Sequence, residues 1–489
     1  PEFDRISYRN SYYLFIYKMR VDQLIIIYIW KLKFKSQELK KDKIKVIELF
    51  AGVGGFKLGL EGDTNGKSST SNYTKNLNSH YKVIWSNQFE PLTKSVQHAS
   101  EIYKTVWPED IHSNKNIEEV IEDDFKSIPN HDMLVGGFPC QDYSVATTLK
   151  NSKGLEGKKG VLWWSIYSIL KKKGKNKAKY IILENVDRLL ISPSNQRGRD
   201  FAVILSCLDE LDYAVEWRVI NAADYGMPQR RRRVFIVAYH KTTNIYKKQA
   251  KQKKDRLLTE SVLQNAFPCL ENSSKLFEGI IGNDRVKISN TFNKNGKTNP
   301  FLNSGFMIKG KYYTAKLKAN YHQSPILLEN IYIKDEKKIP VEFWIDKKRK
   351  LKKEIIKIQF DGSKKVLKTE WDMWKYLKGS KKELKTNKAE GYQYKYAEGS
   401  MVFPDNLESP SRTIITGEGG ASPSRFKHVI EHNGKERRLI SKELERLNMF
   451  PDDHTKNELV SDTKRAFLMG NALVVGVVEK IGIELNKIM

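Results

Sequence analysis

The arrangement of apolar runs between residues 43 and 240 limits the possible folds more than any other feature of this chain. Six short runs rich in β-forming residues alternate with longer amphipathic stretches, and this alternation is typical of βαβ units. The runs lie at residues 45–50, 83–87, 133–135, 180–183, 214–221 and 234–237. The chain is therefore expected to fold as an α/β protein around a sheet.

The rest of the chain has a different character. Residues 241–400 are rich in Lys, Asn and Tyr with only short apolar runs, and they predict a separate, irregular and basic domain. A regular apolar pattern resumes at Ser409, and residues 472–485 have the apolar spacing of a helix after a Gly470-Asn471 turn. Residues 1–43 carry no readable chemistry and are expected to be an N-terminal extension, whose first three residues resemble a cloning remnant.

The composition indicates a polyanionic partner. Lysine and arginine account for 86 of 489 residues against 58 acidic residues, which gives a formal net charge of +28. Nucleic acid is the leading candidate because binding it would offset the self-repulsion of such a chain. Compositional bias explains part of the lysine excess but not the run from Arg230 to Arg233. With 39% apolar residues, the chain has enough material for a core and for two or three domains.

Cysteine usage and hydropathy indicate the cell compartment. Cys140, Cys207 and Cys269 are odd in number and widely spaced, so they support neither a disulfide framework nor a zinc site, and a reducing cytoplasm fits them. The most apolar N-terminal stretch covers only residues 24–30, far fewer than the ~20 residues of a membrane span. Neither a transmembrane helix nor a signal peptide is expected.

A glycine-rich loop follows the first apolar run. Ala51-Gly52-Val53-Gly54-Gly55-Phe56 stands where a strand would pass into a helix, and glycines there let backbone N–H groups approach a nucleotide-like ligand. Lys57 occupies the place of the third glycine of a dinucleotide motif, so a simple tight turn remains the alternative. The next run ends in Gln88-Phe89-Glu90, suited to a ribose contact and an adenine stack. These residues predict an adenosine-containing cofactor.

A cysteine and a glutamate each follow an apolar run. Cys140 comes directly after a Phe-Pro pair that restricts the backbone, which suits a nucleophile; the alternative is a buried structural thiol. Glu184 follows the run 180–183 at the carboxyl end of the predicted sheet, where open α/β sheets bind ligands. Burial would raise its pKa and suit it to share a proton with a heteroaromatic nitrogen, whereas a capping or ion-paired glutamate is the alternative.

Four arginines precede the last of the six runs. Alternation along a strand places Arg231 and Arg233 on one side and Arg230 and Arg232 on the other. One side could then meet the active site and the other a DNA backbone. A basic patch that binds only phosphates is the alternative.

Five motifs in this order resemble the DNA (cytosine-5) methyltransferase family. They are Phe-Ala-Gly-Val-Gly-Gly at 50–55, Gly-Phe-Pro-Cys-Gln at 137–141, Glu-Asn-Val at 184–186, Gln-x-Arg-x-Arg at 229–233 and Gly-Asn-Ala at 470–472. The resemblance implies a Rossmann-like S-adenosylmethionine-dependent methyltransferase sheet with helices on both faces, plus a smaller irregular target-recognition domain. The expected divisions are 1–43 (extension), 44–240 (catalytic), 241–400 (target recognition) and 401–489 (returning to the catalytic domain).

The resemblance also implies catalytic roles. Cys140 would add to C6 of a cytosine flipped out of the duplex, and Glu184 would engage N3. Arg233 would contact O2 of the base, with Arg231 supporting that site. C5 would then take a methyl group from S-adenosylmethionine, leaving S-adenosylhomocysteine, and loss of the C5 proton and of Cys140 would give 5-methylcytosine.

The cofactor site implied by the resemblance draws on several parts of the chain. Phe89 would stack on adenine, and either Gln88 or Glu90 would bind the ribose, because the family usually has an acidic residue where this chain has Gln88. Asp110-Ile111 would contact the adenine edge, with Asp124-Phe125 as the alternative. No metal is expected. The full set is Phe50, Gly52, Gly54, Gly55, Gln88, Phe89, Glu90, Asp110, Ile111, Pro139, Leu162, Asn471 and Ala472.

The expected partner is double-stranded DNA, methylated by a cytoplasmic monomer in restriction-modification or epigenetic marking, with a cognate restriction endonuclease as a further partner. Two alternatives remain open: an RNA cytosine-5 methyltransferase, disfavoured by the long segment 241–400, and a catalytically inactive DNA-binding regulator. An amino-methyltransferase is excluded because Asn299-Pro300-Phe301 lacks the second proline of that motif. Residues 410–413 resemble a motif that organises the recognition domain. The target sequence cannot be read from the chain.

Overall fold

A computed structural model describes residues 43–62, 80–91, 96–138, 162–252, 260–270, 275–387 and 390–489. The chain divides into the unit Pro1–Ile44 and the compact unit Lys45–Met489. Nearly all of the first unit lies outside the described residues.

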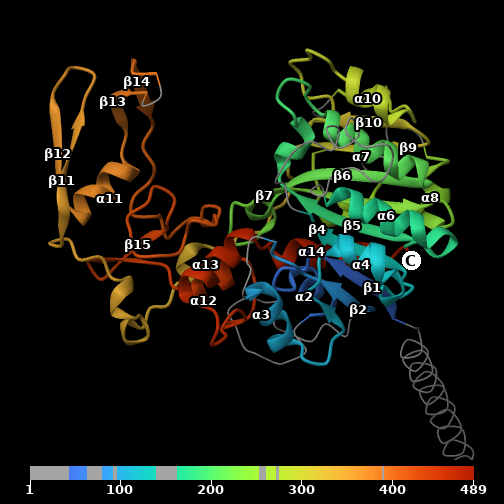
Figure 1. Cartoon of the computed structure of the whole chain (residues 1–489), viewed down its shortest axis with the longest axis horizontal. Helices are drawn as coiled ribbons and strands as arrows, with labels where there is room; N and C mark the ends of the chain where they lie inside the picture. The colour runs from blue at the N-terminus through green and yellow to red at the C-terminus, as the bar shows by residue number, and fades with distance from the viewer. Residues whose placement is uncertain are drawn as a thin grey trace, which may run out of the picture. The chain divides into compact units, whose positions relative to one another are not determined.

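A ten-stranded sheet forms the centre of this unit, with the strand order β3-β2-β1-β4-β5-β7-β6-β9-β10-β8 (Figure 1). Strand β4 runs parallel to β1 and β5, whereas β7 is antiparallel to both β5 and β6. All six predicted strands are confirmed. The bounds are β1 Ile44–Leu49, β2 Tyr81–Asn87, β3 His112–Ser113, β4 Met133–Gly137, β5 Tyr180–Asn185, β6 Tyr213–Asn221, β7 Arg232–His240, β8 Phe277–Ile280, β9 Ser304–Ile308 and β10 Lys311–Ala315.

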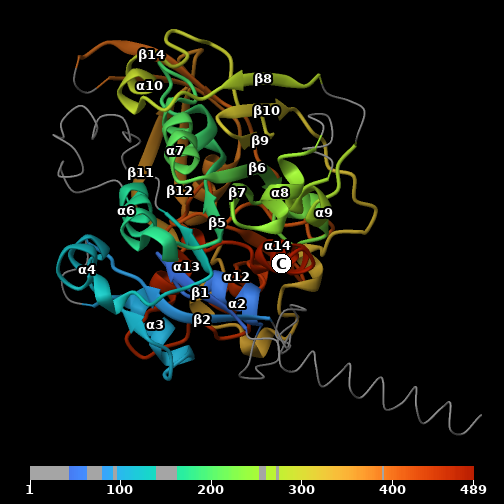
Figure 2. The ribbon, with the colours of Figure 1, turned by 90° about the vertical axis from the view of Figure 1, so that its right-hand side faces the viewer.

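Helices cover both faces of the sheet, as expected for this fold class (Figure 2). One face carries α4 Ile117–Asp123, α6 Trp163–Lys173, α7 Arg199–Glu210 and α10 Arg285–Thr291, and the other carries α2 Gly55–Glu61, α9 Val262–Ala266 and α14 Val475–Asn486. The helices α3 His98–Val106 and α8 Asn244–Gln249 pack beside β3 and β7. Central strands such as β5 are buried on both faces, which explains why they read as unbroken apolar runs.

The sheet continues past residue 241, where a domain boundary is predicted. Strand β9 pairs with β6 in the register Val215↔Met307 and Arg218↔Ser304, and β10 and β8 continue the same sheet. Without β9, β6 would present the unpaired N–H and C=O groups of an edge strand. The sheet therefore extends to Ala315, well inside the segment assigned to target recognition.

The remainder of that segment is irregular. It contains short 3₁₀ turns and two antiparallel hairpins, and Trp374 and Leu367 are buried. A third hairpin and the helices α12, α13 and α14 follow. The elements are η6 Leu328–Asn330, η7 Glu336–Lys338, η8 Val341–Phe343, β11 Lys350–Ile358, β12 Lys364–Thr369, α11 Glu370–Lys378, β13 Lys381–Thr386, β14 Gln393–Glu398, β15 Val429–His432, β16 Lys435–Arg438, α12 Ser441–Leu447 and α13 Asp462–Asn471.

The C-terminal helices are part of the core. The stretch Asp462–Asn486 is long and apolar enough to cross a membrane, but 67% of its most apolar window is buried inside the protein. Helix α14 packs closely on α2, because a Cβ added to Gly59 would lie 2.7 Å from the Cβ of Val478. This burial is typical of a core helix.

Candidate active site

Glu184 and Arg233 form an ion pair at the carboxyl end of β5. The Nε of Arg233 lies 2.8 Å from Oε1 of Glu184, and the two side chains are only 19% and 13% exposed. Glu184 is in register with Gly137 of β4, and a Cβ on Gly137 would lie 3.3 Å from Oε2 of the glutamate. A larger residue at 137 would therefore crowd the carboxylate, which occupies the sheet edge where such folds bind ligands.

Asn185 connects the ends of two strands. Its side-chain amide donates a hydrogen bond to the carbonyl of Phe138 (2.9 Å), and its own oxygen accepts one from the N–H of Val186 (2.8 Å). Phe138 is thereby held beside Glu184. The predicted nucleophile Cys140 and the predicted cofactor residue Pro139 follow Phe138 directly in the chain and lie outside the described residues.

The glycine loop has an unusual backbone. Phe50 has φ +54°, a left-handed conformation rare for a bulky residue and often associated with functional sites. Gly52 (φ +56°) faces open space, since an added Cβ would meet nothing within 4 Å. Gly54 (φ +82°) is instead packed tightly, because an added Cβ would lie 2.1 Å from Trp107. Gly52 therefore leaves room in front of the loop, whereas Gly54 allows the loop to pack behind.

The end of β2 lies against this loop. The side-chain oxygen of Gln88 accepts a hydrogen bond from the N–H of Gly52 (2.8 Å), and Phe89 is 37% exposed. The carboxylate of Glu90 is engaged elsewhere, by the N–H of Ala99 (3.1 Å) and by Lys464 (3.2 Å). Of the two residues proposed for the ribose, Gln88 is thus the one that contacts the loop.

The C-terminal segment reaches the same loop from the far end of the chain. A ring nitrogen of His454 lies 2.7 Å from the carbonyl of Val53, and Leu473 packs against Gly55. The predicted cofactor residues Asn471, which is exposed, and Ala472, which is half-buried, immediately precede Leu473. The remaining predicted residue, Leu162, is half-buried at the start of α6 and packs against the main core.

Comparison with known proteins gives one consistent result. Residues 44–487 match the family model of the C-5 cytosine-specific DNA methylases. The chain is 41% identical to the type II methyltransferase M.Sau3AI of Staphylococcus aureus over 91% of its own length and 96% of that protein. It is also 32% identical to M.HhaI of Haemophilus parahaemolyticus, over 42% of this chain and 53% of that one.

The chain belongs to the C-5 cytosine-specific DNA methylase family.

A solved structure supports the fold of this methylase. The DNMT2 mutant structure from Spodoptera frugiperda aligns with a TM-score of 0.50 at 14% identity, covering 91% of this chain and 99% of that one. The predicted α/β methyltransferase fold and the predicted DNA cytosine-5 methylation are confirmed. The alternatives of an RNA enzyme and of an inactive regulator are not favoured.

Arg231 is a buried structural residue in this methylase. Its Nη1 donates to the carbonyl of Ile414 (3.0 Å) and its Nη2 to that of Gly470 (2.9 Å), and the residue is 2% exposed. Burial lowers the pKa of its guanidinium to about 9. Arg230 and Arg232 are exposed, so the predicted alternation is correct. Arg231 therefore holds the C-terminal segment against the chain just before β7, and its support of Arg233 stays a prediction.

Asp110, predicted to contact adenine, has a different partner. Its carboxylate lies 2.8 Å from Nζ of Lys57, which also pairs with Glu61 (3.1 Å) and lies over the ring of Trp107. Lys57, where a dinucleotide motif has glycine, is thus part of a buried ion-pair network. Ile111 is 66% exposed.

The alternative pair, Asp124-Phe125, lies on another element, η1 Phe125–Ser127, where Lys172 and Lys173 cover the Phe125 ring. Neither pair is shown to contact adenine, and the assignment of the adenine edge stays a prediction.

Sequence reasoning missed three residues that organise the site. Asn185 and Gln229 belong to two of the five motifs, but the sequence assigned neither a role. Gln229 accepts a hydrogen bond from the N–H of Ile414 (3.0 Å) and donates one to Asn448 (2.9 Å). Glu48 is a carboxylic acid within the apolar strand β1, and that anomaly was a usable signal. Its Oε1 accepts from the N–H of Phe56 (3.1 Å), and burial raises its pKa to about 8.

Proposed function

We propose that this methylase modifies one short DNA sequence as the protective partner of a type II restriction endonuclease, using S-adenosylmethionine and Cys140. The 41% identical relative that spans nearly the whole chain is named a type II methyltransferase. The observation that carries the catalytic part is the Glu184–Arg233 pair beside the strand end that leads to Cys140. Because its substrate is DNA, we expect the enzyme to act in the cytoplasm, and to do so as a monomer.

The glycine loop fits an adenosine cofactor. Three features in or next to the loop support this: the open space at Gly52, the exposed ring of Phe89 and the left-handed backbone at Phe50. Gln88, held to Gly52 through its oxygen, keeps its amide nitrogen as a donor for a ribose hydroxyl. When bound there, S-adenosylmethionine supplies the methyl group.

The residues of the site divide methyl transfer to C5 of cytosine into two easier steps. Cys140 adds its sulfur to C6 of the flipped cytosine, and the ring electrons move toward N3 and C5, so that C5 becomes nucleophilic. Glu184 holds a proton at N3, and Arg233 keeps the carboxylate in place through its 2.8 Å contact while reaching O2 of the base. After methylation, loss of the C5 proton lets the sulfur leave and restores the aromatic ring.

The primary experiment measures transfer of tritiated methyl groups to mixed-sequence duplex DNA, followed by bisulfite mapping. Label in 5-methylcytosine at one recurrent sequence is expected. Glu184→Gln should lower kcat by at least about 100-fold, the usual contribution of a proton-transferring group. Glu210→Gln is the matched control, because Glu210 also pairs with an arginine, Arg285, but lies on α7; it should retain wild-type activity.

A second experiment tests the covalent step. DNA with 5-fluorocytosine at the target has no C5 proton to lose, so the adduct should persist as a denaturant-resistant complex with the wild type. Cys140→Ser should abolish it. Trapping that persists in this variant would refute Cys140 as the nucleophile, and equal kcat for Glu184→Gln and the wild type would refute the role of Glu184.

A further inference from the structure

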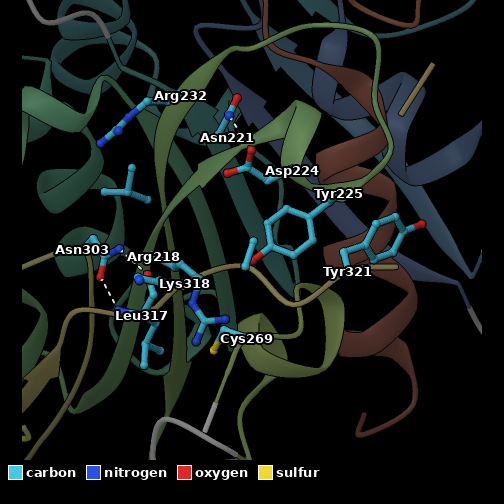
Figure 3. Close-up of a pocket in the computed structure, with 12 residues that line it drawn as sticks. Arg218, Asn221, Asp224, Tyr225, Arg232, Cys269, Asn303, Leu317, Lys318 and Tyr321 are labelled. Carbon is cyan, nitrogen blue, oxygen red and sulfur yellow. Dashed lines mark hydrogen bonds between the residues drawn. The ribbon is translucent and has the colours of Figure 1, made fainter. Parts of the chain in front are cut away.

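Two adjoining cavities run along the sheet edge beside the Glu184–Arg233 pair. Their volumes are about 510 and 330 Å³, and they share Val219, Arg232 and Asn303 in their linings. We call the combined feature the β6–β10 groove. Figure 3 shows the larger cavity, with Arg232 and Asn221 at one end and Tyr321 and Cys269 toward the other.

Strand direction places this groove on the active-site edge. Strand β7 is antiparallel to both β5 and β6, so β5 and β6 end at the same edge. Strand β9 is antiparallel to β6 and to β10, so β10 ends there as well. The carboxyl ends that carry Glu184, Asn221 and Lys316 therefore face the same side of the molecule.

The groove reaches the strand ends that carry the Glu184–Arg233 pair, through the neighbouring residues Arg232 and Asp187. Arg232 precedes Arg233 in β7, and its Nε lies 3.2 Å from Asp187, three residues after Glu184. From there the groove passes over the end of β6 to the segment after β10. Asn303 fixes that segment, because its amide donates to the carbonyl of Leu317 (2.8 Å) and its oxygen accepts from the N–H of Leu317 (2.9 Å).

Basic side chains dominate the lining. Five basic residues face two acidic ones: Arg188, Arg218, Arg232, Lys316 and Lys318 against Asp187 and Asp224. Both acids already have partners, since Asp187 pairs with Arg232 and Asp224 accepts a hydrogen bond from Asn221 (2.8 Å). The groove therefore carries excess positive charge.

Arg218 adds a buried charge beneath the groove. The residue is only 3% exposed, and its hydrogen bonds go to neutral oxygens. These belong to Ser304 (3.3 Å), Gln264 (3.0 Å) and the carbonyls of Leu263 (3.4 Å) and Phe267 (2.7 Å). No carboxylate among the described residues forms an ion pair with it. A buried guanidinium in a low-dielectric wall attracts anions in the cavity above it more strongly than an exposed one would.

We propose that the β6–β10 groove binds backbone phosphates of the duplex that flanks the flipped cytosine, extending the footprint beyond the target site. The proposal rests on the proposed function, since the DNA must already be held at Glu184. An open basic groove with Lys316 and Lys318 exposed on its rim suits a continuous polyanion. It suits a stacked base less well, because Tyr225 is 5% exposed and meets Tyr321 edge-on.

The test replaces both rim lysines, in the variant Lys316→Gln/Lys318→Gln. The control is Lys287→Gln/Lys311→Gln, which removes the same charge from α10 and from the start of β10, at the opposite sheet edge. KM for DNA is measured against salt on two duplexes, one ending close to the target site and one with long flanks. Each phosphate contact makes affinity fall about 3.5-fold between ~50 and ~200 mM salt.

The groove variant should lose about two such contacts on the long duplex, so its salt-induced fall in affinity should be about 12-fold smaller than that of the wild type. On the short duplex, its kcat and KM should match the wild type. The control should match the wild type on both duplexes. A groove variant that keeps the wild-type salt dependence on the long duplex would overturn the proposal. Absence of DNA methylation by the wild type would instead overturn the proposed function.

Discussion

Two glycines of the loop at residues 50–55 provide a matched test of the structure. Gly52 and Gly54 both have positive φ, +56° and +82°, so alanine at either position incurs the left-handed backbone cost of about 1–2 kcal/mol. They differ in what the new methyl group meets. At Gly52 it meets nothing within 4 Å, whereas at Gly54 it would lie 2.1 Å from Cζ3 and 2.4 Å from Cη2 of Trp107.

The two substitutions should therefore differ in which property they change most: protein stability at Gly54, and cofactor binding at Gly52. Gly54→Ala should add an overpacking cost of about 1–3 kcal/mol to the backbone cost, for a total loss of about 2–5 kcal/mol in the free energy of unfolding. Gly52→Ala should lose only the backbone cost of about 1–2 kcal/mol. Its methyl group, however, would project into the space proposed for the cofactor and raise KM for S-adenosylmethionine.

Urea denaturation followed by tryptophan fluorescence measures the first effect, and initial rates against S-adenosylmethionine measure the second. Trp107 itself reports on the loop, because it is buried behind Gly54. Equal stability of the two variants would refute the packing argument. An unchanged KM in Gly52→Ala would show that the cofactor does not occupy the space in front of this glycine.

Three further predictions concern residues behind the site. Burial raises the pKa of Glu48 from its ordinary value of 4.5 to about 8, so the free energy of unfolding should fall as pH rises between these values, by up to about 1.4 kcal/mol per pH unit. Glu48→Gln should flatten this dependence on pH, and an unchanged slope would contradict the prediction. Asn185→Ala frees the carbonyl of Phe138 and should lower kcat at least about tenfold with little change in binding of S-adenosylmethionine by calorimetry. Arg231→Lys loses at least one of two bonds to the C-terminal segment and should reduce the free energy of unfolding by about 1–3 kcal/mol; a change confined to kcat at wild-type stability would instead indicate a direct catalytic role.

Much of the fold followed from local sequence. Strands such as β4 and β5 are buried on both faces, so their sequences had to be continuous apolar runs, and their ends could be located. Glu184 follows such a run, and its position at the strand end required no knowledge of its neighbours. That Arg231 and Arg233 share one side, opposite Arg230 and Arg232, followed from strand alternation alone.

Only the tertiary structure decided how these residues are used. Alternation could not show that segments around Ile414 and Gly470 cover Arg231 and leave Arg233 to pair with Glu184. It could not show that Gln88 contacts the glycine loop, whereas the carboxylate of Glu90 is engaged by Lys464. Strand β9 pairs with β6 although the two lie far apart in the sequence. Because β9 is short, its sequence pattern alone is too weak to predict this pairing. Local pattern specifies which groups a segment presents, whereas long-range packing decides which partner each group meets.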